Sequence, residues 1–148
     1  MIVRKNTGGA YGALRDPSDS EGLRKDMIAV KEYLRAHCRE DVDCKKAAWA
    51  LGLSDSYIEK TFGREVGATI RQYVIICRVE ESTKLLTGTS MRIEEICAAV
   101  GMRTPAWYTK CFHRYYGISP TEYRRRDRMG VELPDLIVKG DKNLHKVV

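Results

Sequence analysis

The chain has 148 residues, of which 31% are charged and 43% are hydrophobic, and its formal net charge is +6. This length suits one ordinary domain or two small domains that share a connecting helix, and it leaves no room for a separate effector-binding domain beside them. No run of about 18 apolar residues and no signal-peptide pattern is present, so we expect a soluble, cytoplasmic protein without membrane contact.

The first half of the chain predicts a flexible leader followed by a helical subdomain. Residues 1–20 are rich in Gly, Asp and Ser and show no periodicity, which is typical of a mobile segment. From about Ser20 the apolar residues follow helical spacing as far as His37. A short helix from about Cys44 to Leu51, a turn at Gly52 and a further helix that ends near Glu65 complete a first subdomain over residues 21–69.

A long helix is predicted over residues 70–86, and it is the only connection between the two halves. The second subdomain, residues 87–126, repeats the earlier order of elements. Glu94 and Glu95 fall in the first turn of its first helix, where acids suit the helix dipole. The second helix of this subdomain has Thr104 as its N-cap and Pro105 at its first helical position, and it should reach about Tyr115.

The C-terminal part is less regular. Gly117 ends the helix that begins at Pro105, and a last short helix should run through Tyr123. Residues 127–148 contain one apolar cluster among glycines and a proline, so they form either a short docked helix or a disordered tail.

The segment from Cys44 to Tyr73 is repeated, with one insertion, as Ile93 to Tyr123. Before the insertion the equivalent residues are 49 apart: Ala47, Ala48, Leu51, Gly52 and Leu53 match Ile96, Cys97, Val100, Gly101 and Met102. After it they are 50 apart: Tyr57, Ile58, Phe62, Gly67 and Tyr73 match Trp107, Tyr108, Phe112, Gly117 and Tyr123. The repeat therefore predicts two linked helix-turn-helix units, because two copies are too few for a propeller or a solenoid.

The positive charge is confined to the repeated part. Residues 44–126 hold 14 basic and 8 acidic side chains, whereas the flanking segments are balanced. A local cationic excess favours a polyanionic partner, since neutralised phosphates release counterions on binding. A basic surface that serves only solubility is the alternative.

Five cysteines, at positions 38, 44, 77, 97 and 111, form no Cys-x-x-Cys pair. Their odd number and spacing argue against a disulfide framework and against a zinc cluster, and we expect reduced thiols and no cofactor. Cys97 and Cys111 fit small core positions better than redox sensors. An enzymatic reading, such as methyl transfer to a thiol, lacks a paired base or a set of metal ligands.

Four motifs resemble the DNA-binding domain of the AraC/XylS family of bacterial transcription regulators over about Leu23 to Arg126. They are LGLSDSYIEKTFGREVG, RVEESTKLL, IEEICAAVGM and GISPTEYR. The resemblance implies an all-α protein of about seven helices whose two helix-turn-helix units place their second helices in adjacent major-groove segments of double-stranded DNA. It also implies a regulator that binds DNA as a monomer at the nucleoid, and an activator that contacts RNA polymerase.

The chain departs from the family pattern at several places. Met102 stands where Phe is usual, which is an apolar exchange that the core should tolerate. Cys44 and Ala47 replace bulkier aliphatic residues, so the first unit is expected to pack less tightly. Arg92 stands where a capping Ser or Thr is common, with Ser90 as a possible substitute.

The residues that read DNA are predicted by elimination of the core-facing ones. Ile58 and Phe62 face inward in the first unit, and Tyr108 and Phe112 do so in the second. The base-contact candidates are Ser56, Glu59 and Lys60, with Asp55 at the helix start, in the first unit, and Arg103, Pro105, Ala106, Thr109 and Lys110 in the second.

Lys60 and Lys110 can donate to guanine, whereas Pro105 and Ala106 offer only apolar contact, so the second unit should read fewer bases. Glu59 either accepts from a cytosine amine or forms a helix pair with Arg64.

Contacts to the DNA backbone are expected from Arg64, Arg71, Trp107, His113 and Arg114. Trp107 has core packing as its alternative role. The run from Arg124 to Arg126 either lies on a solvated face, or interacts with the negative end of its helix, or contacts phosphate.

The competing function is a helical protein-interaction module, for RNA polymerase or an anti-activator, in which DNA contact is secondary. The steep salt dependence of DNA affinity would separate the two functions.

Overall fold

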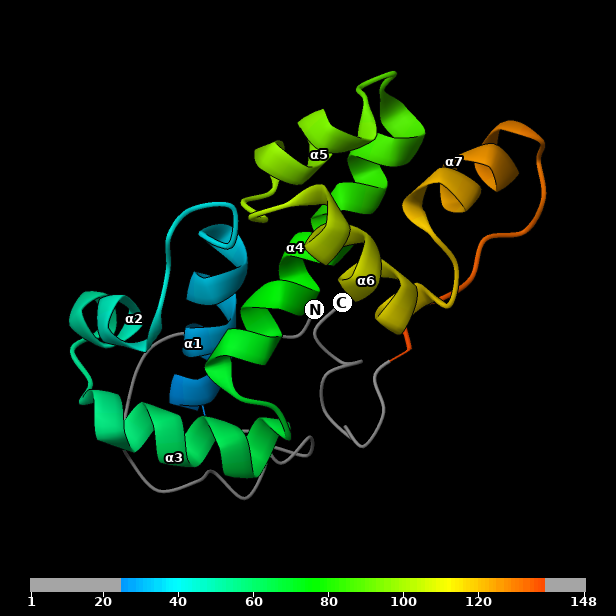
Figure 1. Ribbon diagram of the computed structural model, residues 1–148. Helices are drawn as coiled ribbons and strands as arrows, with labels where there is room; N and C mark the ends of the chain where they lie inside the picture. Colours follow the sequence, from blue (N-terminus) through cyan, green and yellow to red (C-terminus); the bar gives the residue numbers. More distant parts are fainter. Residues whose placement is uncertain (1–24, 138–148) are drawn as a thin grey trace. The chain divides into compact units, whose positions relative to one another are not determined.

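The computed structural model describes residues 25–137, and every regular element within these residues is a helix. The leader and the end of the tail lie outside the described residues. The helices are α1 (Lys25–Ala36), α2 (Cys44–Leu51), α3 (Asp55–Val66), α4 (Ile70–Gly88), α5 (Ile93–Ala99), α6 (Pro105–Tyr116) and α7 (Pro120–Arg128) (Figure 1). The predicted all-α class with seven helices is confirmed for this part of the chain.

The described residues divide into two compact units. The first comprises 25–37 and Val42–Val74, and the second comprises Cys38–Asp41 and 75–137. The helix α4 has 19 residues and so is about 28 Å long. The division falls within α4 and not at its ends.

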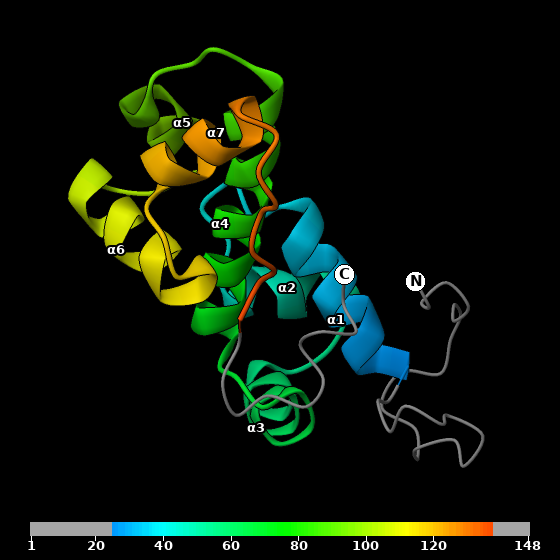
Figure 2. The same cartoon turned by 90° about the vertical axis from the view of Figure 1, so that its right-hand side faces the viewer.

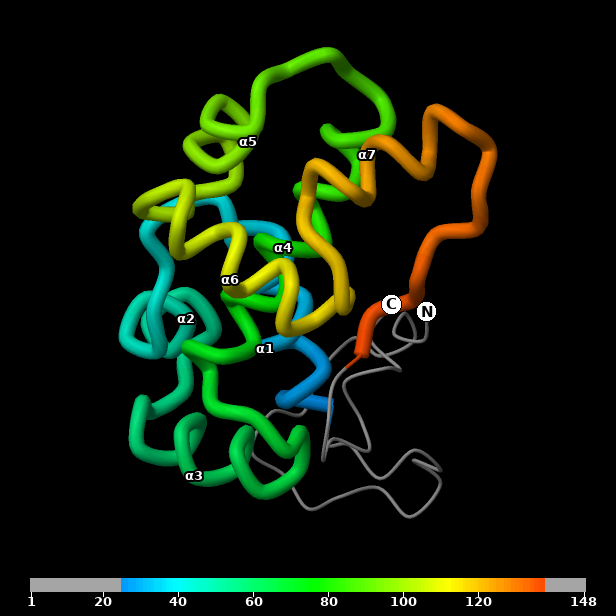
Figure 3. The backbone as a smooth tube through the Cα atoms, turned by 45° about the vertical axis from the view of Figure 1, so that its right-hand side comes forward, coloured from blue at the N-terminus to red at the C-terminus, as the bar shows by residue number. Residues whose placement is uncertain are grey.

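Both units follow the predicted course of a helix, a tight turn and a second helix, α2 to α3 and α5 to α6 (Figure 3). The Ser54 hydroxyl accepts a hydrogen bond of 3.1 Å from the Tyr57 N–H, and the Thr104 hydroxyl accepts one of 3.1 Å from the Trp107 N–H. The two helices that begin at these caps therefore start at equivalent positions. Each cap satisfies an amide that has no partner within its helix.

The core of the first unit is built from apolar side chains of all its helices. They include Met27, Val30, Leu34, Ala47, Ile58, Phe62, Val66 and Tyr73, each with 0% exposure. The α1 helix also contributes Asp26, whose carboxylate accepts a hydrogen bond from the Tyr57 hydroxyl. The small residues of α2 are thus buried within a continuous core, and the departures at Cys44 and Ala47 leave the fold of this unit intact.

The core of the second unit repeats an aromatic contact of the first. Phe62 meets Tyr73 edge to face with ring centroids 5.5 Å apart, and Phe112 meets Tyr123 edge to face at 5.4 Å. Tyr116 stacks on Phe112 at 4.8 Å and enlarges the cluster. Since both pairs are residues 50 apart in the repeat, the internal duplication extends to the geometry of the core.

Two helices are longer than predicted, and one start is defined differently. The helix α4 continues two residues beyond Leu86, and α7 continues to Arg128. At the start of α5 the Glu95 carboxylate accepts a 2.8 Å hydrogen bond from the Arg92 N–H. Glu95 therefore supplies a side-chain hydrogen bond at this helix start, where the sequence had offered Ser90 as a substitute for a capping Ser or Thr.

After α7 the chain returns, without helical structure, along the second unit to the end of α6 (Figure 2). The Ile137 N–H donates a 2.7 Å hydrogen bond to the carbonyl oxygen of Tyr115. This bond satisfies one of the carbonyl groups that a helix leaves unpaired at its C-terminal end. Residues 131–137 are not helical, and the remainder of the tail lies outside the described residues, so the choice between a docked helix and a disordered tail stays a prediction.

None of the helices in residues 25–137 is long and apolar enough to cross a membrane.

Candidate nucleic-acid interface

The second helices of the two units, α3 and α6, bury equivalent faces. Ile58 and Phe62 in α3 and Tyr108 and Phe112 in α6 all have 0% exposure, as the sequence predicted. Residues four apart lie on one side of a helix, so the opposite side of each helix faces outward. Lys60 and Lys110 occupy equivalent positions on these outer faces, and both are exposed.

The predicted base-contact residues lie on these outer faces or at their N-terminal ends. Asp55 and Thr109 are half-buried, and the others are exposed: Ser56, Glu59, Lys60, Arg103, Pro105, Ala106 and Lys110. Within each unit they lie in the first two turns of the second helix or, as Arg103 does, just before it. The first unit presents charged and hydroxyl groups there, whereas α6 presents Pro105 and Ala106 before its first charge.

The predicted backbone-contact residues are also exposed: Arg64, Arg71, Trp107, His113 and Arg114. The Trp107 side chain is 42% exposed, which argues against its alternative role in the core. The Arg114 guanidinium lies 5.7 Å from the Tyr115 ring centroid, a contact that limits its mobility.

The start of α3 carries an ion pair that orients its charges. The Lys45 Nζ lies 3.1 Å from the Asp55 carboxylate, and this hydrogen bond holds the pKa of Asp55 below its ordinary value. The Arg64 Nη2 lies 3.9 Å from the carboxylate of its neighbour Glu65. Within the described residues no ion pair joins Arg64 to Glu59, which was one of the two alternatives for Glu59. The Glu59 carboxylate is exposed on the outer face.

The turn of the second unit is packed against a backbone segment, Cys38–Asp41. A Cβ atom added to Gly101 would lie 2.7 Å from the carbonyl oxygen of Arg39. The Arg78 side chain fixes this segment, because its Nε donates to the Cys38 carbonyl at 2.6 Å and its Nη2 to the Glu40 carbonyl at 2.9 Å. Gly52, the equivalent residue of the first unit, has no atom within 4 Å of such a Cβ.

The Arg124 side chain holds the end of α4 and the loop that follows it. Its guanidinium donates hydrogen bonds to four backbone carbonyls, those of Leu85, Leu86, Thr89 and Met91, at 3.4, 3.0, 3.1 and 2.6 Å. Arg124 is therefore used inside the unit, and the phosphate-contact alternative does not apply to it. The planar guanidinium suits this task, because it presents several donors in one fixed fork.

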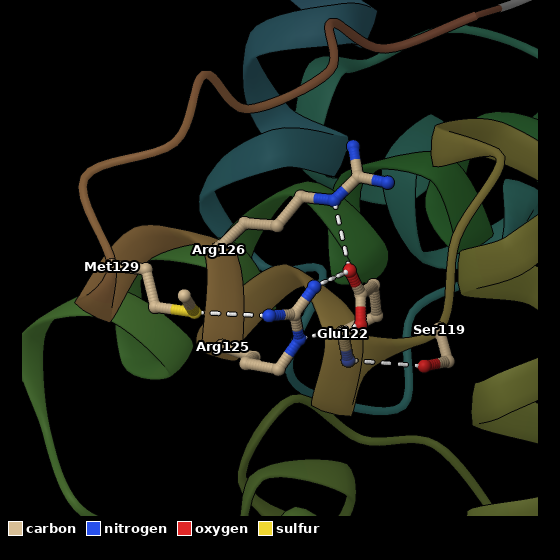
Figure 4. A network of polar contacts seen from close by, with 5 residues as sticks. All are labelled: Ser119, Glu122, Arg125, Arg126 and Met129. Atoms are coloured by element: carbon tan, nitrogen blue, oxygen red, sulfur yellow. Dashed lines mark hydrogen bonds and ion pairs between the residues drawn. The ribbon is translucent and has the colours of Figure 1, made fainter.

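The other two arginines of the run pair with one acid on the same helix (Figure 4). The Glu122 carboxylate accepts from Arg125 at 2.6 Å and from Arg126 at 2.9 Å, and the Glu122 N–H donates to the Ser119 hydroxyl. These ion pairs offset part of the positive charge at the end of α7.

Acid is expected to weaken the second unit through Glu122. Its bonds to Arg125 and Arg126 lower the pKa of Glu122 from 4.5 to about 2. A lowered folded-state pKa stabilises the fold above the unfolded-state pKa, and this contribution is lost as the pH falls from 4.5 towards 2. Urea unfolding of wild type and Glu122→Gln across this window should show a steeper loss for the wild type. Parallel curves would contradict the role of the carboxylate.

Three features were not predicted from the sequence: the backbone contacts of Arg78, those of Arg124, and the exposure of Trp49. The Trp49 side chain is 88% exposed on α2, although the repeat places it on a helix that is otherwise anchored by small buried residues. The structural arginines were missed because their partners are backbone carbonyls about 40 residues away.

The five cysteines are buried and form no disulfide within the described residues, in line with the predicted core positions of Cys97 and Cys111. Burial is the main cause that raises the pKa of Cys44, to about 11, and burial also raises the pKa of Cys97 and Cys111. Such thiols remain protonated near neutral pH and are poor nucleophiles. This chemistry does not favour the thiol-transfer interpretation.

A family model described as a helix-turn-helix domain matches residues 47–126. Among curated proteins, an uncharacterized HTH-type transcriptional regulator of Bacillus subtilis (strain 168), YisR, is 33% identical over 103 residues, which are 68% of this chain and 36% of that protein. The xylose operon regulatory protein of Escherichia coli (strain K12) is 30% identical over 124 residues, 84% of this chain and 29% of that protein. The chain thus spans about a third of the length of these relatives.

Solved structures of similar domains share this arrangement of helices. The DNA-binding domain of AdpA, a global transcriptional factor solved in complex with a target DNA, is 25% identical with a TM-score of 0.63, over 70% of this chain and 94% of that one. The C-terminal domain of AraT, a response regulator from Geobacillus stearothermophilus, is 27% identical with a TM-score of 0.61, over 67% of this chain and 83% of that one. An AraC-type regulator from Chromobacterium violaceum, at 22% identity and a TM-score of 0.65 over 68% of this chain and 90% of that one, shares the fold.

Proposed function

This chain belongs to the AraC/XylS family of transcription regulators, and from that premise we propose that it binds double-stranded DNA with α3 and α6 in adjacent major-groove segments. The observation that carries the proposal is the equivalence of the two outer faces. Each of the two helices buries two large side chains on its inner side and presents a lysine on its outer side, Lys60 in α3 and Lys110 in α6. One copy supplies both helices, so it binds a site as a monomer.

The first unit reads more of the sequence than the second. Lys60 donates to the O6 and N7 atoms of guanine, and Glu59, which lies exposed beside it, accepts from the amine of cytosine. In the second unit Lys110 reads a guanine, while Pro105 and Ala106 offer a surface for a thymine methyl group. We therefore expect a strongly specified half-site and a more degenerate one.

Backbone contacts fix the position of each helix in its groove. Arg64 and Arg114 lie at equivalent positions near the ends of α3 and α6, and both are exposed. Their guanidinium groups suit phosphate oxygens, which carry no sequence information. The positive excess of residues 44–126 supports this part of the proposal.

Selection of bound duplexes from a random pool tests the proposal. We expect two conserved half-sites about one helical turn, ~10.5 base pairs, apart. The affinity for the selected duplex should fall steeply as the salt concentration rises. A protein-interaction module with incidental DNA contact would select no sequence, and that outcome would reject DNA reading as the function.

Substitutions of Lys60 and Arg64 should separate base reading from backbone contact. Lys60→Ala is expected to cost about 1 to 3 kcal/mol of binding free energy on the selected duplex and to relax the preference at one base pair. Arg64→Ala should weaken binding to all duplexes alike and reduce the salt slope by about 1. Fluorescence anisotropy on matched and mutated duplexes measures both effects.

The same pair of substitutions in the second unit, Lys110→Ala and Arg114→Ala, is the internal control. If all four variants lost affinity equally on every duplex, neither lysine would read a base.

The regulator is proposed to activate transcription through contact with RNA polymerase when it is bound beside a promoter. A relative from Staphylococcus xylosus that is 24% identical over 102 residues, 69% of this chain and 37% of that protein, carries the name lactose operon transcription activator. A reporter gene downstream of the selected site should show increased transcription, and reduced transcription would identify a repressor.

A further inference from the structure

The first helices of the two units, α2 and α5, carry opposite charges on their exposed faces. In α2 the exposed residues Lys45, Lys46 and Trp49 lie within one turn of each other, and we name them the α2 face. The residues 49 positions later in the repeat are Glu94, Glu95 and Ala98 of α5, all of them exposed, and we name them the α5 face. Every position of the basic face thus corresponds to an acidic or small residue in the other unit.

The exposed indole of Trp49 indicates that the α2 face is covered by a partner. With 88% exposure, this side chain leaves almost all of its surface in water. A Trp side chain can bury about 150 to 250 Å² and is among the residues that dominate protein interfaces. DNA phosphate could use only the indole N–H and would leave the apolar ring in water, so a phosphate contact would not account for the apolar surface.

The charges beside Trp49 specify the partner. Lys45 and Lys46 lie one helical turn before Trp49, and the Lys45 side chain is exposed. The ion pair between Lys45 and Asp55 lies at the surface, where such pairs contribute little to stability and can be exchanged. A complementary surface must therefore carry carboxylates around a small side chain against which the indole can lie.

We propose that the α2 face of one copy docks on the α5 face of a second copy of this chain. Lys45 and Lys46 then meet Glu94 and Glu95, and the indole of Trp49 covers Ala98. The two faces differ, so the contact is heterologous and joins copies head to tail. Copies bound to neighbouring DNA sites would be held together by it.

The contact is small, and its expected strength follows from its size. A stable interface buries upwards of about 1,000 Å² in total, which one tryptophan and four charges do not reach. Free copies should therefore associate weakly. Copies that occupy adjacent sites on one duplex experience a high effective concentration, and there the same contact yields cooperative binding.

Two single charge reversals test the contact without DNA. Lys46→Glu makes the α2 face less basic, and Glu94→Lys makes the α5 face less acidic. Neither substitution breaks the Lys45–Asp55 pair or the Glu95 bond to the Arg92 N–H. Circular dichroism establishes that each variant is folded.

Sedimentation equilibrium at low salt, at concentrations up to about 1 mM, is the measurement, since weak contacts are populated there. The wild type should associate, each variant alone should associate about tenfold more weakly, and an equimolar mixture of the two should recover the wild-type level. A monomeric wild type, or a mixture as weak as its components, would overturn the proposal.

Trp49→Ala tests the apolar part of the contact. Truncation of a central interface tryptophan should weaken self-association about tenfold or more, and Met129→Ala, which removes another exposed apolar side chain, should leave it unchanged. On a duplex with a single selected site, Trp49→Ala should bind as the wild type does. If Trp49→Ala instead lost affinity for the single site, Trp49 would belong to the DNA contact and the proposed contact between copies would be wrong. If the wild type itself failed to bind the duplex, the proposed DNA binding would be wrong.

Discussion

Gly101→Ala should destabilise the second unit by about 2 to 5 kcal/mol, more than the same substitution at Gly52. Gly101 has a φ of +85°, where an L-residue is strained by about 1 to 2 kcal/mol. The new methyl group would also meet the Arg39 carbonyl oxygen at 2.7 Å, and backbone atoms cannot move aside as a flexible side chain can. The strain and the clash act together in this turn.

Gly52→Ala is the matched control, because Gly52 has a φ of +70° and open space around it. It should cost only about 1 to 2 kcal/mol. Urea unfolding in a Trp49→Phe background measures the effect at Gly101, since Trp107 is then the sole tryptophan and lies in the second unit. A Trp107→Phe background, in which Trp49 of the first unit is the sole tryptophan, measures the effect at Gly52. Equal losses from the two glycine variants would show that the carbonyl of Arg39 does not restrict the turn.

Arg124→Ala should destabilise the second unit by about 2 to 4 kcal/mol. The substitution removes the guanidinium donor from four backbone carbonyls at the end of α4 and in the loop before α5, of which the Leu85 carbonyl keeps its bonds from Thr89. Partial exposure lets water replace some of these bonds, which keeps the loss below the sum of four charged hydrogen bonds. The same urea unfolding experiment provides the measurement.

Arg124→Lys sharpens the test, because it keeps the charge but removes the planar fork of donors. If geometry is what matters, lysine should recover less than half of the loss. Arg128→Ala, an exposed arginine on the same helix, should change stability by less than about 0.5 kcal/mol. A full rescue by lysine would mean that charge near the end of α4 is sufficient.

The sequence predicted helix ends well where a local cap defines them. Ser54, Thr104 and the turn at Gly52 act within a few residues of their partners, so the signal for α2, α3 and α6 lies in adjacent sequence. The end of α4 was placed too early, because Thr87 and Gly88 suggested a break. There the Arg124 guanidinium satisfies carbonyls of the last turn, and this partner is 38 residues away from Leu86.

The outer faces of α3 and α6 were predictable for the same reason as the core. The spacing of Ile58 and Phe62 shows which side of α3 is buried, and the remaining side follows from helical geometry. The ion pair between Lys45 and Asp55 and the docking of Cys38–Asp41 beside Gly101 were not predictable. They depend on how separate helices approach one another, and periodicity holds no information about that approach.

The placement of Cys38–Asp41 limits how the gene could be dissected. These four residues precede α2 in the chain, yet they belong to the second unit, where Arg78 and Gly101 contact them. A recombinant fragment that begins at α4 would lack them and would expose the donors of Arg78, so the downstream half should fold poorly when expressed by itself. Since α1 packs in the first unit together with residues 42–74, an exchange of modules between such regulators would keep both units whole only with a crossover point upstream of α1.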